Sequence, residues 1–186
     1  FNDGWQKNLR IDYGDVAWSA TGERLTKESF ARYRKQGGWV LIHMMKDENI
    51  ERAIAHAGVI IASDGVPFIA GKGHPRGAGT FARVLGRYSR EKKLLSLMDA
   101  VAKMTILPAR RLEHVPAMRH KGRIAVGADA DLTVFDPATV IDRATFEVPT
   151  TPSAGIPHVI VNGVFVVRDG ELVKGIMAGR PIRAAR

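Results

Sequence analysis

The stretch GVIIASDG, residues 58–65, decides the fold, because an apolar run ends there at a carboxylate and a glycine. A continuous Val/Ile run such as residues 59–62 is typical of a strand buried on both faces, as in a parallel sheet covered by helices. In such sheets functional side chains lie at the carboxyl ends of the strands, where Asp64 falls. Asp before Gly is also common in turns, so a turn carboxylate is the alternative. Spacing alone leaves both interpretations open.

Helical and strand-like segments alternate before this run. We predict a helix from Thr26, a good N-cap, to the glycines at 37–38. An apolar strand-like run follows at residues 39–45, and Asp47 is a candidate cap for the next helix. The order helix, strand, helix, strand is α/β, and we expect the strands to be parallel.

A long loop and further helices follow the run. Residues 65–80 are rich in Gly and Pro, and loops of this length are usually functional. Ser96 and Asp99 resemble a capping box. Pro108 either interrupts that helix or starts a new short one.

The last third of the chain has an antiparallel β pattern. DLTVFD at 131–136 is a short strand, and HVIVNGVFVVRDGELV at 158–173 contains two turn pairs, Asn-Gly and Asp-Gly, between Val-rich arms. We therefore predict an α/β part at residues 1–120 and a β part at residues 121–186.

Composition limits the classes of function. The 186 residues are 45% hydrophobic and contain no cysteine, which excludes disulfides, thiolate zinc sites and cysteine nucleophiles. We expect a cytoplasmic protein, since this composition fits a reducing compartment, and no run is long enough for a membrane span. The first residue is Phe rather than Met, so we expect a segment of a longer protein.

The net charge of +9 is concentrated between Lys72 and Lys93, where seven basic residues meet one acidic residue. Only Phe81 and Tyr88 lie among them as stacking aromatics, so the pattern favours a solvated basic face over a nucleic-acid surface.

Five motifs together carry a family resemblance. The motifs occur in the order ASDG, HPRGAGTFARVLGRY, LSLMDAVAKMTILPARRL, KGRIAVGADADLTVFDP and HVIVNGVFVVRDGEL. They resemble the C-terminal part of amidohydrolase-superfamily enzymes, in the D-aminoacylase (N-acyl-D-amino-acid deacylase) branch, over roughly residues 47–186. The resemblance implies the C-terminal part of a TIM (β/α)8 barrel at 1–120, followed by part of a β-sandwich at 121–186.

The resemblance also implies a chemistry. Such enzymes use zinc to activate a water molecule that attacks the amide of an N-acyl amino acid. Asp64 matches the aspartate that moves the proton, and it is also a possible zinc ligand. Arg76 matches the position that binds the substrate carboxylate, for which a guanidinium fork is suited. His74 either lines the pocket or has a structural role in the loop.

The remaining metal ligands cannot be found in this sequence. None of its six histidines forms a His-x-His or His-Glu-x-x-His motif. We therefore expect an N-terminal segment of the same enzyme to supply them. The alternative is a non-catalytic, truncated or degenerate piece that acts as a basic interaction module. Asp129 and Asp131 could suggest a cation site, but turn and strand-end carboxylates are the simpler interpretation.

Overall fold

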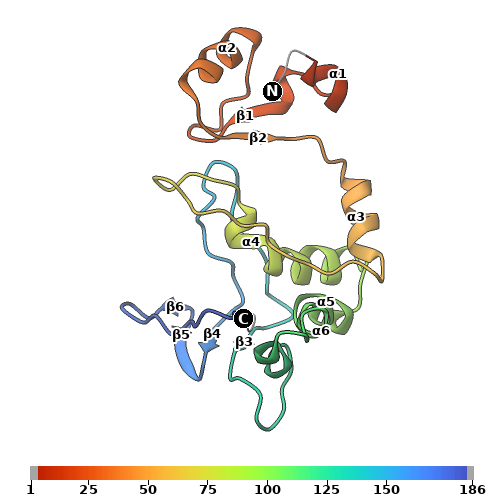
Figure 1. Ribbon diagram of the computed structural model, residues 1–186, viewed down its shortest axis with the longest axis vertical. Helices are drawn as coiled ribbons and strands as arrows, with labels where there is room; N and C mark the ends of the chain where they lie inside the picture. The colour runs from red at the N-terminus through yellow and green to blue at the C-terminus, as the bar shows by residue number, and fades with distance from the viewer. Residues whose placement is uncertain (1–3, 184–186) are drawn as a thin grey trace.

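The computed structural model describes residues 4–183. Short helices dominate its first two thirds, and an antiparallel sheet occupies the last third (Figure 1). In chain order the elements are α1 (Trp5–Leu9), η1 (Tyr13–Asp15), β1 (Val16–Trp18), α2 (Lys27–Gln36), β2 (Val40–Ile42), α3 (Asp47–Ala55), α4 (Arg76–Arg83), η2 (Val84–Glu91), α5 (Leu97–Met104), α6 (Ile106–Arg111), η3 (Pro116–His120), β3 (Leu132–Val134), β4 (His158–Val161), β5 (Val164–Arg168) and β6 (Glu171–Leu172).

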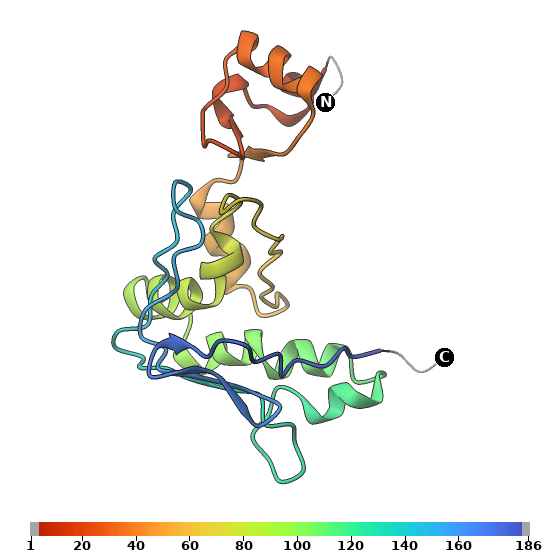
Figure 2. The same ribbon diagram turned by 90° about the vertical axis from the view of Figure 1, so that its left-hand side faces the viewer.

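Residues 4–42 build a small unit with a core of its own, at one end of the molecule in both views (Figures 1 and 2). Helix α2 begins at the predicted cap, because the Thr26 hydroxyl accepts from the Ser29 amide at 3.2 Å. It packs over the two-stranded sheet β1–β2. The core of this unit consists of Trp5, Val16, Trp18, Leu25 and Phe30.

The prediction of parallel strands is wrong for this unit. β2 pairs antiparallel with β1, with Val16 opposite Ile42 and Trp18 opposite Val40. β1 has only three residues, and all three are buried, so neither its length nor an alternating pattern marks it in the sequence.

The apolar run at 59–62 is also not a strand among the described residues. Its backbone is held instead from α5, since the Ile61 amide donates to the carbonyl of Lys103 at 3.0 Å. A strand exists only through its neighbours, and no strand of the described chain runs beside this segment. The described strands accordingly close no barrel.

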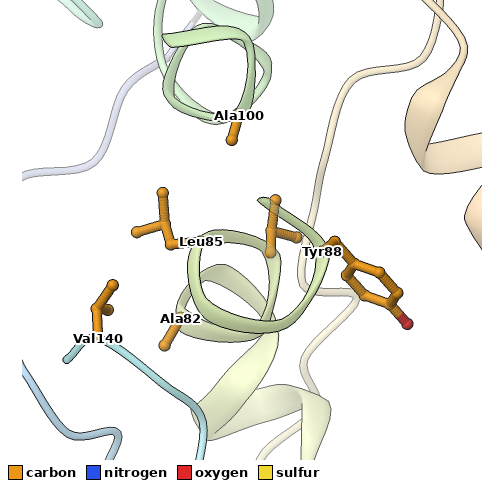
Figure 3. Close-up of a cluster of buried hydrophobic side chains, with 6 residues drawn as sticks. Ala82, Leu85, Tyr88, Ala100 and Val140 are labelled. Carbon is orange, nitrogen blue, oxygen red and sulfur yellow. The ribbon is translucent and has the colours of Figure 1, made fainter. Parts of the chain in front are cut away.

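The helical part forms a second core (Figure 3). The predicted loop at 65–80 is shorter than expected, because α4 begins at Arg76 and continues directly into the π-helix η2. At the start of α3, Lys46 occupies the N-cap position in place of the predicted Asp47, which lies in the first turn. The second core consists of Ala82, Val84, Leu85, Tyr88, Ala100 and Val140.

The next helices show half of the expected capping box and decide between the two alternatives for Pro108. The Ser96 hydroxyl accepts from the Asp99 amide at 3.1 Å and caps α5. Pro108 lies in the first turn of a separate short helix, α6, where its missing N–H costs nothing.

The predicted antiparallel β region is confirmed as a single sheet in the order β3-β4-β5-β6. Asn162 and Gly163 turn between β4 and β5 with φ of 52° and 80°, as a type I′ turn requires, and Asp169-Gly170 makes the next turn. Among residues 4–183 no second sheet packs against it, so a two-sheet sandwich is not present in the described chain.

The connection between β3 and β4, residues 135–157, leaves the sheet and runs along α4 and η2 before it returns (Figures 1 and 2). Asp142 accepts from Arg83 of α4 at 2.8 Å, and the Ser153 hydroxyl donates to the carbonyl of Ala78 at 3.1 Å. Gly86 lets η2 and the connection approach closely, since a Cβ there would lie 2.5 Å from the Val140 carbonyl oxygen. These contacts bring the middle of the connection to the loop that follows Asp64.

Candidate active site

Asp64 lies in a tight turn that its neighbours define. Its own φ is +48°, in the left-handed region that Asp tolerates better than most residues. The Ser63 hydroxyl accepts from the Gly65 amide at 3.2 Å and closes the turn. Gly65 lies at a close approach, because a Cβ there would lie 3.3 Å from Cα of Gly77.

Arg76 holds Asp64 at two points. Its Nη2 lies 2.7 Å from Oδ2 of Asp64, and its Nε donates to the backbone carbonyl of the same residue at 2.8 Å. The structure therefore brings together the two residues that the sequence places twelve positions apart. The Asp64 side chain is 81% exposed, so its carboxylate faces open solvent. We call these two contacts of Arg76 with Asp64 the clamp. The clamp uses two of the five guanidinium N–H groups, which leaves donors for a second carboxylate.

His74 has a structural role in this arrangement. Its Nδ1 accepts from the backbone amide of Arg76 at 3.1 Å and satisfies a donor in the first turn of α4. Burial, then the neighbouring Arg76 and His43, lower the pKa of His74 to about 4, although Asp64 acts in the opposite direction. The hydrogen bond requires an unprotonated Nδ1, which a neutral ring provides. This contact supports the structural role of His74 in the loop.

Phe146 joins this site from the distant connection between β3 and β4. Its ring centroid lies 5.1 Å from that of His74 and 4.7 Å from that of His43, so it stands between the two histidines. Burial is the largest cause of a lowered pKa at His43 as well. The Lys72 ammonium donates to the carbonyl of Glu147 at 3.3 Å and fixes the same segment. No motif in the sequence marks Phe146, because its role depends on chain crossing between remote segments.

The basic run is largely paired within the molecule. Five of its seven members form ion pairs with acidic side chains. These pairs are Arg76–Asp64, Arg83–Asp142, Arg87–Asp47, Arg90–Glu91 and Lys92–Glu51. The run therefore stabilises contacts between segments and is not a solvated basic face.

The carboxylates of Asp129 and Asp131 are also accounted for. Both face the ammonium group of Lys121, which lowers the pKa of Asp131 through a hydrogen bond. A lysine of the chain itself thus occupies the place that a cation would take.

The described residues do not form a metal site by themselves. No group of three or more His, Asp or Glu side chains converges anywhere in residues 4–183. Asp64 is the one sequence-predicted ligand, and its carboxylate is paired with Arg76.

An apolar cavity lies elsewhere in the structure. It has a volume of about 590 Å³ and is lined mainly by apolar residues of α5, α6 and β3, such as Val101, Ile106 and Leu132. None of Asp64, His74 or Arg76 lines it, so it is not part of this site.

No helix among the described residues has the length and apolarity that crossing a bilayer would require.

A sequence model described as "Amidohydrolase family" matches residues 52–167, which include Asp64, His74, Arg76 and Phe146. The chain belongs to the amidohydrolase family. Within this amidohydrolase, the matched region begins in α3 and ends in β5, so it includes the whole candidate site except His43.

Relatives place this amidohydrolase chain beside D-aminoacylases. It is 53% identical over 126 residues to an N-acyl-D-glutamate deacylase of Alcaligenes xylosoxydans xylosoxydans, an alignment that covers 67% of this chain and 25% of the relative. It is 43% identical over 145 residues to a D-aminoacylase of the same organism, with 78% and 29% covered.

A solved structure gives the same result. An N-acyl-D-glutamate deacylase from Bordetella bronchiseptica, complexed with zinc and a phosphonate inhibitor, matches at a TM-score of 0.71 and 35% identity. That match covers 92% of this chain and 38% of the other. The amidohydrolase chain thus spans between about a quarter and two fifths of the length of these relatives.

Proposed function

We propose that this chain is the C-terminal part of a zinc-dependent enzyme that hydrolyses the amide bond of N-acyl-D-amino acids. In that enzyme residues 1–120 belong to the C-terminal part of a (β/α)8 barrel and residues 121–186 to a β-sandwich. The observation that carries the proposal is the clamp of Arg76 on Asp64 inside the region that the family shares. Three relatives of this region are named as deacylases of D-amino-acid substrates.

Asp64 is proposed as the group that moves the proton. A bound zinc ion supplies a water molecule activated for attack on the amide carbonyl. An exposed carboxylate can accept the proton of that water and return it to the amine that leaves. Without the returned proton the amine is a poor leaving group, so one residue serves both halves of the reaction.

Arg76 is proposed to bind the carboxylate of the substrate while it holds Asp64. The guanidinium group has donors beyond the two that the clamp uses, and a second carboxylate can share the same fork. Substrate and Asp64 would then be fixed by one rigid planar group, which aligns the amide with the carboxylate. His74 supports this alignment through the Arg76 amide.

The metal ligands other than Asp64 are proposed to come from an N-terminal segment of the same enzyme. A catalytic zinc ion takes three protein ligands and keeps one open position. No cluster of three such ligands occurs in residues 4–183, so activity is proposed to depend on the rest of the barrel.

The test uses a chimera, in which residues 52–167 replace the matching segment of the Alcaligenes N-acyl-D-glutamate deacylase. Asp64→Asn should lower kcat on N-acetyl-D-amino acids by about 10²- to 10⁴-fold, with zinc content unchanged. Asp129→Asn is the matched control for altered charge within the replaced segment, and it should keep most of the activity because Asp129 pairs with Lys121, outside the candidate site.

Two results would contradict the proposal. Full activity of the Asp64→Asn chimera would remove Asp64 from the proton-transfer step. A chimera that folds and binds zinc but has no activity with Asp64 intact would favour the non-catalytic alternative.

A further inference from the structure

Lys103 is a buried lysine that is bound to the segment leading to Asp64. It lies in α5 with 4% of its surface exposed. Its ammonium group donates to the backbone carbonyls of His56 and Val59 at 2.5 and 2.7 Å. Its own carbonyl accepts from the Ile61 amide at 3.0 Å. One residue thus makes three hydrogen bonds to residues 56–61.

Packing alone does not explain a lysine at this place. Burial of an ammonium group is unfavourable unless hydrogen bonds replace its water shell, and an apolar side chain of similar volume is often more stable in such a position. The two bonds from the ammonium group are charge-assisted and directional, so they fix the orientation of the backbone that they contact.

The contacted segment needs such an anchor. Residues 59–62 have no strand ladder within the described chain, and the Ile61 amide is bonded to Lys103. Ile61 lies only three positions before Asp64, where Arg76 holds the turn from the other side. A change in the direction of the segment at Ile61 therefore moves the Asp64 carboxylate.

We infer that Lys103 is a positioning residue for Asp64: it sets the direction of the segment at 56–61 and thereby the place of the carboxylate in the proposed hydrolysis. The inference rests on the proposed function. Lys103 has no contact with substrate in this reasoning, and its effect passes entirely through Asp64. Two variants that act through the same step should not have additive effects.

The experiment is a double-mutant cycle in the chimera with Lys103→Met and Asp64→Asn. Lys103→Met should lower kcat by about 10- to 100-fold, because a displacement of about 1 Å at a reacting group has that cost, with KM within about twofold. In the Asp64→Asn background the same change should lower kcat by less than about twofold. Lys92→Met, at an exposed pair with Glu51, is the control and should leave kcat unchanged.

Hydrogen exchange supplies a second readout. The Ile61 amide should lose protection in Lys103→Met while the amides of η2 keep theirs. If the Met variant does not fold, Lys103→Gln is carried through the same cycle, because its amide keeps a donor.

Equal effects of Lys103→Met in both backgrounds, or loss of zinc in step with kcat, would overturn the inference and leave a general structural role. So would an unchanged kcat when Asp64→Asn is inactive. An active Asp64→Asn chimera would instead contradict the proposed function, so the two failures are distinguishable.

Discussion

Gly38 in the N-terminal unit allows no side chain, and its replacement by alanine should unfold that unit selectively. A Cβ at position 38 would lie 2.2 Å from Cη2 of Trp18 and 2.9 Å from its Cζ2. The indole cannot retreat freely, because it is 7% exposed and stacks on Tyr33 with ring centroids 4.3 Å apart. The backbone φ of +145° is a second obstacle, since side-chain-bearing residues rarely adopt it.

The two costs together are large for so small a unit. A strained backbone conformation costs about 1–3 kcal/mol, and forced repacking of a filled core costs about 1–3 kcal/mol. We expect Gly38→Ala to lower the free energy of unfolding of the unit by about 2–6 kcal/mol. Gly22→Ala is the matched control: it also has a positive φ, +78°, but no atom lies within 4 Å of the added Cβ. Its cost should be about 1 kcal/mol.

Intrinsic tryptophan fluorescence reports on the unfolding of the N-terminal unit. The three tryptophans are Trp5, Trp18 and Trp39, and all lie in or beside this unit. Urea titrations followed by fluorescence should show a lower midpoint for Gly38→Ala than for Gly22→Ala, while far-UV circular dichroism retains the helices of the second core. Equal midpoints for the two variants would refute the steric reasoning. A simultaneous loss of both signals would refute the separate core.

Two further predictions concern the candidate site. In the chimera, Arg76→Lys should lower kcat/KM for N-acyl amino acids by about 10- to 100-fold, because a lysine cannot replace the guanidinium fork. The loss should be much smaller for the same amides without a free carboxylate. Equal losses on both substrates, or an equal effect of Arg87→Lys, would make Arg76 purely structural. The pKa of His74 is lowered from 6.5 to about 4, so between these pH values the folded chain binds fewer protons than the unfolded chain. The free energy of unfolding therefore falls as the pH decreases from 6.5 to about 4. His74→Gln should flatten that pH dependence in urea titrations, whereas His114→Gln, at an exposed position, should not.

Local chemistry explains which elements the sequence could predict. The Asn162–Gly163 turn, the Thr26 cap and the Ser96 cap each depend on residues within four positions of one another, and all are confirmed. The family motif assigned Asp64 and Arg76 to one site, but their direct contact was not predicted from the sequence.

The missed features all depend on partners that periodicity cannot identify. The run at 59–62 has the composition of a buried strand, but its backbone partner is a lysine in α5. Phe146 reaches His43 and His74 only because Arg83, Ser153 and Gly86 guide the connection between β3 and β4 along the helices. The antiparallel pairing of β1 and β2 likewise followed from no pattern in three consecutive buried residues.

The clamp on Asp64 and the aromatic contacts of Phe146 differ in the length of chain that each must close. Arg76 follows Asp64 by twelve positions, whereas Glu147, beside Phe146, follows Lys72 by 75 positions. Loop-closure entropy grows as (3/2)RT ln n, so the longer closure costs about 1.6 kcal/mol more before any contact is made. During folding the charged half of the site therefore assembles from local chain, and the aromatic half follows once the sheet and its connection have docked.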